Sequence, residues 1–559
     1  MIKELNLLFL SLFYSALSIL GQNGSNSLDI LPNVDGPNLG INKPNVIRSP
    51  QNWTSDKIIE MTQKMEKEHY SVALNLLLYE DRTIGEESYK MLKAAGIKLK
   101  RGKWADKIVA NAHPSGLLIP IKDHAGSYLY GSNASKTEGS VARQNGDFMR
   151  FSGPGKMEWT IDVKTAGVYE VNLCHSVKSA MKRNYVSLAS GKSAVSYKLM
   201  PTQGVWGTGS FESILLPSTL KLERGNQLIT LTISEAQKGD TVMDFRCVEL
   251  VPQKAKLAIR ADRKEALHSR ANSDWLAKAG YGLMFHWTSQ SVNEDGTQKT
   301  FVKAVEDFDV SAFVRMVEST GAGYVIFTVS HAEPYCPAPL KSWEKYHPGY
   351  TTSRDLIDEI ASALDAKGIK VICYFPPFII GRLPKVDGEE FTKICIDVIT
   401  EFGERYGKKL AGYWFDGWYQ GFEKFPDFPF NRFFHACKLG NPDRIIALNS
   451  WIYPAVTDWQ EYWAGETASP VLPPKDGTIE RGPGKGLRYQ ALIIMEPYWV
   501  QQKAEMPDPR FNAQELTKYI EVCMEQGGAV TINLGIYQDG TVDKKALEIM
   551  KEVRAIIRK

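Results

Sequence analysis

The fold is set by a stretch that reads YVIFTVSH (324–331), then SRDLIDEIASALDAKG (353–368), then IKVICYFP (369–376). The first and last segments are almost continuously apolar, which is typical of strands buried on both faces of a sheet. The middle segment spaces its apolar residues at intervals of three and four, which predicts a helix with one apolar face. The stretch therefore predicts a strand, a helix and a second strand parallel to the first.

The same alternation extends in both directions from this stretch. Upstream, YGLMFHW (281–287) is followed by DVSAFVRMVESTGA (309–322). Downstream, LAGYWFDG (410–417) is followed by NRFFHACKLGNP (431–442) and RIIALNSW (444–451). Repeated strand–helix units of this kind indicate a largely parallel sheet covered by helices.

We therefore expect the C-terminal domain, residues 254–559, to have an α/β fold, namely a (β/α)8-like TIM barrel. An open, doubly wound parallel sheet is the alternative. No glycine-rich phosphate loop follows the first predicted strand, which favours the barrel.

The N-terminal half predicts four further segments. Residues 106–253 alternate apolar with polar residues between Gly-containing turns, which predicts an antiparallel β-sandwich, and KMEWTIDVKTAGVYEV resembles the carbohydrate-binding modules of many glycosidases. Residues 53–105 predict a helical segment, and residues 22–52, rich in Asn, Pro, Gly and Ser, a linker or extended arm. Residues 1–21 carry a lysine and then an uncharged apolar run, the pattern of a signal peptide. We expect an exported protein, periplasmic or secreted, without a membrane span.

Charge and cysteine content exclude several classes of partner. The 559 residues include 67 Lys and Arg against 64 Asp and Glu, a net charge of +3. This balance is too small to favour nucleic acid or an anionic membrane. The 7 cysteines are scattered through apolar segments without a CxxC motif or a Cys/His cluster, so we expect core residues rather than a zinc site or a disulfide framework. We expect no metal or organic cofactor.

Polar and aromatic side chains stand at the ends of the predicted barrel strands. They are His286, Trp287, His331, Glu333, Tyr374, Asp416, Asn449, Trp451 and Glu496. A single buried histidine is more often a hydrogen-bonded core residue than a catalytic one. Several strands that end in such groups at one face of a barrel predict an active site there.

Asp416 is the carboxylate that most needs an explanation, because it follows the apolar run LAGYWF and precedes Gly417. A buried, unpaired carboxylate is costly. It could cap the next turn by accepting backbone N–H groups. It could instead be the nucleophile of a glycoside hydrolase, in which a second carboxyl, about 5–5.5 Å away in retaining enzymes, protonates the leaving oxygen. The residues alone leave both explanations open.

Five segments, in order, resemble the retaining α-L-fucosidases of glycoside hydrolase family 29. WFDG resembles the strand that carries the family's nucleophile, and YGLMFHW resembles the family's first strand. The last of the five segments resembles the family's closing stretch, G-G-N-L-L-L-N-x-G-P-x-x-D-G. The segments are YGLMFHW (281–287), DFDVSAFVRMVESTGAGYVIFTVSH (307–331), SRDLIDEIASALDAKGIKVICYF (353–375), WFDG (414–417) and EQGGAVTINLGIYQDGTVDKKALEIM (525–550).

The resemblance implies roles for individual residues. Asp416 falls on the family's nucleophile, His286 on its sugar-binding histidine, His331 on the first histidine of a His-His pair and Tyr374 on its strand-end tyrosine. The aromatic residues expected to line the sugar site are Trp287, Trp414, Trp418 and Trp451.

The sequence departs from the family pattern at four points, which include the part of the pocket that reads sugar hydroxyls. Ala332 stands in place of the second histidine, and Glu333-Pro334 in place of the following Asp-Gly. The Glu-Trp-Tyr segment expected after the first strand is missing, and the predicted sandwich precedes the barrel instead of following it. A site built around particular hydroxyls discriminates strongly when its partners change, so the retaining mechanism is better supported than fucose itself.

The acid/base is predicted from the segment LNSWIYPAVTDWQEYWAGETASP, which resembles the one that carries it in some family members. This places Glu466 first, with Glu461 and Glu496 as alternatives. An acid that acts near neutral pH needs a raised pKa, from apolar walls or from the charge of Asp416. Trp459, Trp463 and Trp499 could supply such walls.

We therefore expect an exported retaining exo-glycosidase, an α-L-fucosidase that removes terminal fucose from fucosylated oligosaccharides or glycoconjugates through a covalent intermediate. One alternative is the same mechanism on a related sugar such as an α-L-galactoside. A second is a glycan-binding protein without activity, and a third is a structural accessory subunit.

Overall fold

The computed structural model describes residues 54–67, 86–99, 128–131, 134–144, 148–163, 165–177, 185–202, 211–234, 242–331, 333–376, 386–418, 425, 428–449, 455, 457–468, 470–479 and 484–559. The predicted signal peptide, the predicted linker and Trp451 lie outside the described residues. Contacts divide the chain into two units, Met1–Pro114 and Ser115–Lys559.

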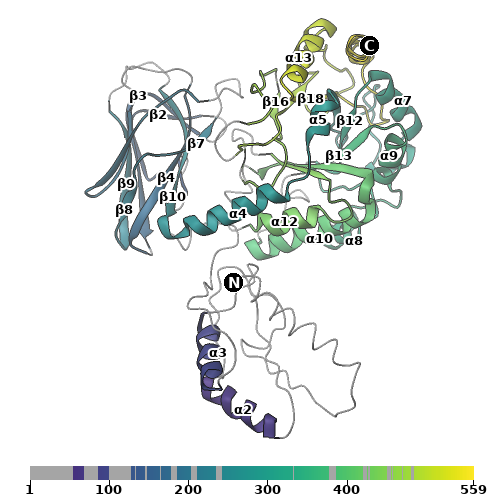
Figure 1. Cartoon of the computed structure of the whole chain (residues 1–559). Helices are drawn as coiled ribbons and strands as arrows, with labels where there is room; N and C mark the ends of the chain where they lie inside the picture. The colour runs from purple at the N-terminus through teal and green to yellow at the C-terminus, as the bar shows by residue number, and fades with distance from the viewer. Residues whose placement is uncertain are drawn as a thin grey trace. The chain divides into compact units, whose positions relative to one another are not determined.

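The first unit contains two helices that pack on each other, α2 (Ser55–Lys67) and α3 (Glu86–Lys98) (Figure 1). Ile58 of α2 and Met91 and Ala95 of α3 form a small apolar core. An ion pair of 2.7 Å joins Lys98 Nζ to Asp56 Oδ1 at the surface. The described part of this unit is thus helical, as expected for residues 53–105.

The N-terminal part of the second unit is a ten-stranded antiparallel sheet in the order β6-β5-β9-β3-β10-β4-β7, with β1 on β10, β2 on β3 and β8 on β4. Buried residues from most of these strands share one apolar core. The strands are β1 (Tyr128–Tyr130), β2 (Lys136–Gln144), β3 (Phe148–Val163), β4 (Gly167–Ser176), β5 (Tyr185–Ser190), β6 (Ser193–Lys198), β7 (Glu212–Leu215), β8 (Leu220–Leu222), β9 (Gly225–Ile233) and β10 (Met243–Pro252).

This sheet follows from the period-two pattern of its sequence. In β9, Ile229, Leu231 and Ile233 are buried, while the residues between them are not. The prediction of an N-terminal antiparallel sheet is therefore confirmed. One charged pair crosses between neighbouring strands, where the Arg150 guanidinium donates two bonds of 2.7 and 2.9 Å to Asp244.

The rest of the second unit is built on an eight-stranded parallel sheet in the order β15-β14-β13-β12-β11-β18-β17-β16. Neighbouring strands of this sheet pair in parallel. The strands are β11 (Tyr281–Phe285), β12 (Tyr324–Thr328), β13 (Lys370–Phe375), β14 (Leu410–Phe415), β15 (Ile445–Leu448), β16 (Glu466–Ala468), β17 (Gln490–Ile494) and β18 (Ala529–Asn533). The α/β class predicted for this region is confirmed.

Two separate apolar clusters lie on the two faces of this parallel sheet, because side chains alternate along each strand. Val371, Cys373 and Phe375 of β13 belong to the large cluster shared with the helices. Ile372 and Tyr374, on the opposite face of β13, belong to a smaller cluster that includes Trp414. We call the second face the inner face of the sheet.

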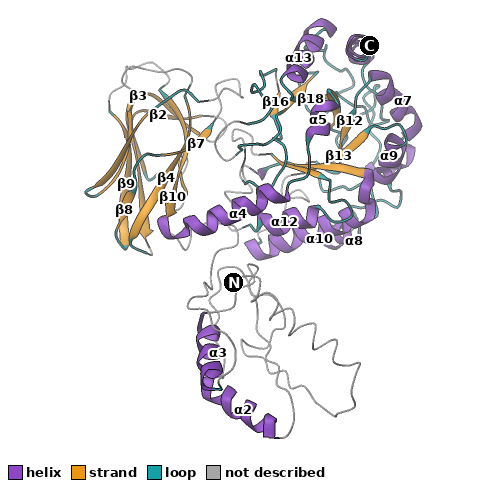
Figure 2. Ribbon diagram, in the orientation of Figure 1, coloured by secondary structure: helices purple, strands orange, loops and turns teal. Residues whose placement is uncertain are grey.

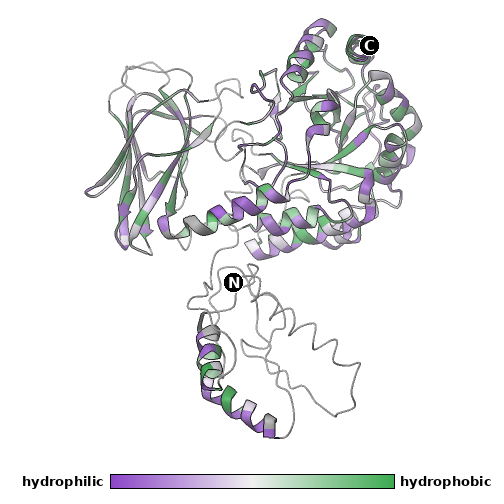
Figure 3. Ribbon diagram, viewed as in Figure 1, coloured by the Kyte–Doolittle hydropathy of each residue, from purple (hydrophilic) through white to green (hydrophobic). Residues whose placement is uncertain are grey.

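Most of the helices cover the outer face (Figure 2). Leu276, on the short helix that precedes β11, instead packs into the cluster of the inner face. Their ribbons mix hydrophilic and hydrophobic residues, as expected of helices with one packed and one solvated side (Figure 3). Aspartates or asparagines cap several of their N-termini, as Asp309 does by accepting from Ala312 N at 2.8 Å. The helices are α4 (Lys256–Ser269), α5 (Asp274–Lys278), α6 (Phe301–Asp307), α7 (Val310–Thr320), α8 (Lys341–Tyr346), α9 (Leu356–Asp365), α10 (Gly388–Tyr406), α12 (Phe430–Cys437), α13 (Ala513–Glu525) and α14 (Lys544–Ile557), with short 3-10 turns η3 (Gln253–Ala255) and η4 (Gly407–Lys409).

The two end strands of the parallel sheet, β15 and β16, are brought together by the segment that precedes β16. The backbone N–H of Glu461 donates to the Ile446 carbonyl of β15 at 2.9 Å. All seven cysteines are buried, which confirms that they are core residues. Among the described helices, none combines the length and the apolar character that crossing a bilayer requires.

Candidate active site

The inner face of the parallel sheet brings polar residues together where its strands end. Asp416 continues the inward series of Gly412 and Trp414, two residues apart along β14. Asn449 continues Ile445 and Ala447 of β15 in the same way. The period of two therefore directs the first polar residue beyond each apolar strand toward the same space.

The Asp416 carboxylate is satisfied by three donors. Its Oδ2 accepts from the Tyr374 hydroxyl at 2.6 Å, and its Oδ1 accepts from Asn449 Nδ2 at 2.8 Å and from the Gly417 backbone N–H at 2.7 Å. Asp416 nevertheless stays half-buried, so solvent reaches it. Only one donor is a local backbone N–H, so the turn-capping explanation covers part of the geometry and side chains from two other strands supply the rest.

Tyr374 links Asp416 to His331. Since the single hydroxyl proton of Tyr374 is donated to Asp416, its oxygen accepts from His331 Nδ1, 2.8 Å away. Burial lowers the pKa of His331, and the charge of Asp416 opposes that effect in part. Trp414 stacks on the Tyr374 ring at 5.2 Å and anchors itself by donating from Nε1 to the Ala464 carbonyl at 2.9 Å.

Asn449 bridges two carboxylates. The two N–H groups of its side-chain amide are directed at Asp416 Oδ1, 2.8 Å away, and at Glu466 Oε2, 2.6 Å away. Because both oxygens lie within hydrogen-bond distance of one nitrogen, the two carboxyls approach each other through these oxygens, which favours the roughly 5–5.5 Å separation of retaining glycosidases over the roughly 6.5–9.5 Å of inverting ones.

Glu466 is the carboxyl whose pKa is raised. Burial raises its pKa to about 8, the negative charge of Asp416 adds to the increase, and the bond from Asn449 opposes it. Gly465 fixes the entry to Glu466 with a φ of 64°, and a Cβ at Gly465 would lie 1.8 Å from the Gln490 carbonyl oxygen. Only glycine fits there.

His286 completes the cluster beside His331, with ring centroids 5.1 Å apart. Its Nδ1 donates to Asn533 Oδ1 at 3.3 Å, and Asn533 Nδ2 donates to the Trp499 carbonyl at 3.1 Å. Burial lowers the pKa of His286 to about 3, with His331 adding to that decrease, so the ring is neutral at pH 7. The half-buried Trp499 ring lies 5.7 Å from His286.

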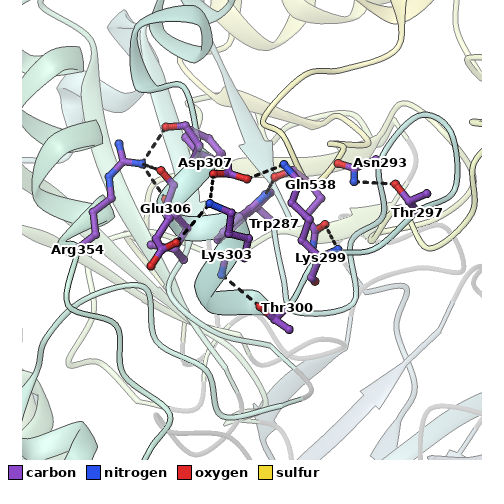
Figure 4. Close-up of polar contacts among 12 residues, drawn as sticks. Trp287, Asn293, Thr297, Lys299, Thr300, Lys303, Glu306, Asp307, Arg354 and Gln538 are labelled. Atoms are coloured by element: carbon purple, nitrogen blue, oxygen red, sulfur yellow. Dashed lines mark hydrogen bonds and ion pairs between the residues drawn. The ribbon is translucent and has the colours of Figure 1, made fainter.

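Two of the predicted sugar-site tryptophans lie elsewhere. Trp287 donates from Nε1 to the Gln538 carbonyl at 3.0 Å, and Gln538 also bonds Lys299, which ties down the loop after β11 (Figure 4). The Trp287 ring packs on Phe308 and other core aromatic rings. Trp418 is buried among rings of the outer face, 4.7 Å from Phe428. Trp287 continues the outward series of β11, and Gly417, with a φ of 73°, ends the strand alternation before Trp418, so we do not propose either residue as a substrate contact.

The two alternative acid/base residues have other partners. Glu461 is buried and accepts from Lys438 Nζ, from Ile446 N at 2.8 Å and from Ala271 N at 3.0 Å. Glu496 is also buried, and its Oε2 accepts from Gly535 N at 2.8 Å. Burial raises the pKa of Glu496 to about 7, and no contact joins it to Asp416 among the residues that the structure describes.

The sequence alone gave Asn449 no role and did not single out Asn533. Both could have been found from strand periodicity, since each is the inward residue that follows a buried inward position, Ala447 and Thr531 respectively. Nothing in the local sequence reports that the Asn449 amide reaches two carboxylates from different strands.

The arrangement defines a class of chemistry. Two carboxyls bond the Asn449 amide, Asp416 just beyond β14 and Glu466 at the first residue of β16, and the pKa of Glu466 is raised to about 8. A carboxylate beside a carboxyl of raised pKa is a pairing that glycosidases use. Within the described ranges, no group of three or more His, Cys, Asp or Glu side chains could hold a metal ion. The fold and the site are those of a glycoside hydrolase.

Comparison with known proteins gives the family. Residues 299–558 match the Alpha-L-fucosidase family, so this domain belongs to the alpha-L-fucosidases. The match includes Asp416 and Glu466 and begins after His286. No curated protein matches the chain.

Several solved structures are similar in part. Alpha-L-fucosidase isoenzyme 1 from Paenibacillus thiaminolyticus is 18% identical with a TM-score of 0.39, and covers 53% of this chain and 76% of its own. The family 29 alpha-L-fucosidase from Bacteroides thetaiotaomicron is 15% identical with a TM-score of 0.41, and covers 52% and 74%. Alpha-L-fucosidase AlfC from Lactobacillus casei, in complex with alpha-L-fucose, is 17% identical with a TM-score of 0.37, and covers 51% and 98%. Likeness at this level does not identify a substrate.

Proposed function

We propose that this glycoside hydrolase is a retaining α-L-fucosidase in which Asp416 is the nucleophile and Glu466 the acid/base. The observation that carries the proposal is the Asn449 amide, which holds the two carboxyls within reach of one nitrogen. Retaining enzymes place their carboxyls about 5–5.5 Å apart, whereas inverting enzymes leave room for a water between them.

In the first step, Asp416 attacks the anomeric carbon while Glu466 donates its proton to the departing glycosidic oxygen. The pKa of Glu466, raised to about 8, keeps that proton in place at neutral pH. The donors on Asp416, Tyr374 and Asn449, hold the carboxylate in one orientation as its charge passes into the covalent bond.

In the second step, the covalent glycosyl-enzyme is hydrolysed by water. Glu466 is a carboxylate at this point, because it gave its proton to the leaving group in the first step. Esterification of Asp416 removes the negative charge that added to the raised pKa of Glu466, which lowers that pKa, and the Glu466 carboxylate then takes a proton from the attacking water. The same residue thus serves as acid and then as base, because the state of its neighbour changes between the steps.

Neutral histidines would recognise the sugar hydroxyls. His286 and His331 both have lowered pKa values and lie at the edge of the carboxylate pair. Their bonds to Asn533 and Tyr374 use Nδ1 in each case and fix the tautomer, which leaves Nε2 as an acceptor for a hydroxyl.

The family match supports fucose as the sugar, and Ala332 in place of the family's second histidine keeps α-L-galactosides as the second candidate. The test is hydrolysis of 4-nitrophenyl α-L-fucoside beside the α-L-galactoside and β-D-galactoside. Faster turnover of the fucoside supports the proposal. Preference for the galactoside would keep the mechanism and replace the sugar, and turnover of the β-D-galactoside alone would contradict both.

Two wider features belong to the same proposal. We infer that the parallel sheet closes as a (β/α)8-like barrel, supported by the bond from Glu461 N to Ile446 O that brings β15 to the segment before β16. We infer export to the periplasm or the medium from the signal-like residues 1–21. Cell fractionation with and without that segment tests the second inference.

The rate should fall on the alkaline side as Glu466 loses its proton. Since the first step needs Glu466 protonated and its pKa is raised to about 8, kcat/KM for the fucoside should decline above about pH 8. A pH–rate profile from pH 4 to 10 measures this limb. A profile that begins to fall near pH 5, the range of an ordinary carboxylic acid, would show that Glu466 is not the acid.

The Tyr374→Phe variant should lose kcat by roughly 10–100-fold, since hydrogen bonds to charged groups contribute about 1.5–3 kcal/mol. The variant removes the donor to Asp416 Oδ2 and leaves the ring stacked on Trp414. Tyr324→Phe is the matched control, because Tyr324 is another buried inner-face tyrosine whose hydroxyl bonds Thr531, at 2.7 Å, and not the carboxylates. Equal losses in both variants would assign the effect to general destabilisation.

A further inference from the structure

The open edge of β15 is closed by side chains. The Asn449 backbone N–H donates to Phe415 of β14 at 2.7 Å. Successive amides along a strand point to opposite sides, so the amides of Ile446 and Leu448 point away from β14. No backbone ladder joins β15 to β16 in the part of the chain that the structure describes, so these amides need other acceptors.

Two consecutive residues, Gln460 and Glu461, supply those acceptors. Glu461 Oε2 accepts from Ile446 N at 2.8 Å, and Gln460 Oε1 accepts from Leu448 N at 3.2 Å. The Glu461 backbone N–H donates back to the Ile446 carbonyl at 2.9 Å. We call the Gln460 and Glu461 side chains the seam clasp. They accept the hydrogen bonds that a neighbouring strand would otherwise accept from β15.

The seam clasp is itself held in place from other directions. Glu461 Oε1 accepts from Lys438 Nζ and, at 3.0 Å, from Ala271 N. The Gln460 side-chain N–H donates to the Thr457 carbonyl at 2.9 Å. Both side chains are buried, Gln460 at 0% and Glu461 at 2% exposure, so water does not compete for these bonds.

The seam clasp is close in sequence to Glu466 and bonds the residue that precedes Asn449. Asn449, which bridges the carboxyls, follows Leu448, the residue held by Gln460. Glu466 follows Glu461 by five residues, with Gly465 between them in its constrained turn. A shift of β15 against this segment would therefore move the Asn449 amide and the Glu466 carboxyl relative to each other.

We propose that Gln460 and Glu461 are positioning residues that set the distance between Glu466 and Asp416 by fixing the register of β15 against the segment leading to Glu466. The inference rests on the proposed function, since it concerns the acid/base of that reaction. It also explains why Glu461, a buried carboxylate near Glu466 in sequence, is structural and not the acid.

The test uses Glu461→Gln and Gln460→Met in the full chain. Glu461→Gln places an N–H donor against Ile446 N or Lys438, and Gln460→Met keeps the volume and removes the acceptor for Leu448 N. Both variants should lower kcat, Glu461→Gln on the order of 10²-fold, the cost of a small misplacement of catalytic groups. Both should also move the alkaline limb of the pH–rate profile to lower pH, because Glu466 drawn away from Asp416 loses the part of its raised pKa that the Asp416 charge contributes, while burial still raises it.

Glu401→Gln is the matched control. Glu401 also accepts from two backbone amides, Lys341 N at 2.8 Å and Ser342 N at 2.6 Å, at the N-terminus of the outer helix α8. It should lose stability without moving the pH–rate profile. Profiles of Gln460→Met and Glu461→Gln that overlay those of wild type and Glu401→Gln would overturn the proposal.

A second readout separates this inference from the proposed function. The pKa of the Glu466 carboxyl can be followed by 13C NMR of glutamate-labelled full-length protein, with Glu466→Gln to assign the signal. If wild type hydrolyses no glycoside, the proposed function fails, and a lower Glu466 pKa in Gln460→Met than in wild type still supports the seam clasp. An unchanged Glu466 pKa contradicts it. If Glu461→Gln does not fold, Gln460→Met alone decides.

Discussion

Asp416→Asn should abolish hydrolysis of 4-nitrophenyl α-L-fucoside, with kcat reduced on the order of 10⁴-fold or more, as when other enzymes lose their nucleophile. Asparagine keeps the size of the side chain and can still accept from Tyr374 or Gly417. It has no carboxylate to form the covalent bond, so binding should survive while chemistry stops. Kinetics and the Kd for fucose, measured on the same preparations, separate the two.

Asp309→Asn controls for the substitution itself. Asp309 caps helix α7 by accepting from Ala312 N at 2.8 Å, and asparagine caps helices equally well. This variant should keep wild-type kcat. If Asp416→Asn kept a tenth or more of the wild-type kcat, Asp416 would not be the nucleophile, and its three hydrogen bonds would describe a structural carboxylate.

Glu466→Gln should reduce kcat by about 10²–10⁴-fold for a fucoside with a sugar leaving group, the usual contribution of general acid catalysis. The loss should be much smaller for 2,4-dinitrophenyl fucoside, whose leaving group departs without a proton. The alkaline limb near pH 8 should disappear, because the group that titrates there is gone. Comparing the two substrates over pH 5 to 10 measures both effects.

The same variant has a stability consequence. A carboxyl with a folded-state pKa raised to about 8 binds a proton that the unfolded chain has already lost, so the free energy of unfolding falls as pH rises from the ordinary range toward 8. Glu466→Gln should therefore be more stable than wild type at pH 8, with the gap closing at pH 5. Thermal melts of both proteins at pH 5 and at pH 8 show whether the stability difference has this sign.

Glu496→Gln is the control for the assignment of the acid. Glu496 is buried and has a raised pKa, as Glu466 does, but it bonds Gly535 instead of the bridging amide. The kcat of the Glu496→Gln variant should depend on the leaving group as the kcat of wild type does. If Glu496→Gln, and not Glu466→Gln, spared only the dinitrophenyl substrate, the acid would be Glu496.

The strands and their inward series were predictable because each is a continuous apolar run with a fixed period. Asp416, Tyr374, His286 and His331 followed from that pattern together with the family resemblance. Trp287 and Trp418 were placed wrongly because proximity in sequence to a site residue is not proximity in space. Trp287 faces the side opposite to its neighbour His286, because side chains alternate along a strand. Trp418 follows Gly417, whose φ of 73° ends the alternation, and its ring packs on the outer face.

The sequence alone could not show which of Glu461, Glu466 and Glu496 is placed to be the acid/base. All three lie near aromatic residues in the sequence, and each acquires a partner from another part of the chain: Ile446 and Lys438 for Glu461, Gly535 for Glu496. Only the folded chain shows that Glu466 shares Asn449 with Asp416. The bridging amide could not be read from spacing, because it joins the ends of three strands.

The most direct test of the retaining pair is the configuration of the first sugar released. Proton NMR of 4-nitrophenyl α-L-fucoside during hydrolysis by the full-length protein resolves the two anomers of fucose before they interconvert. Double displacement through Asp416 predicts α-L-fucose first, with the β anomer appearing only by mutarotation. Initial release of β-L-fucose would contradict the account, because water would then have attacked directly and Asp416 would not be a nucleophile.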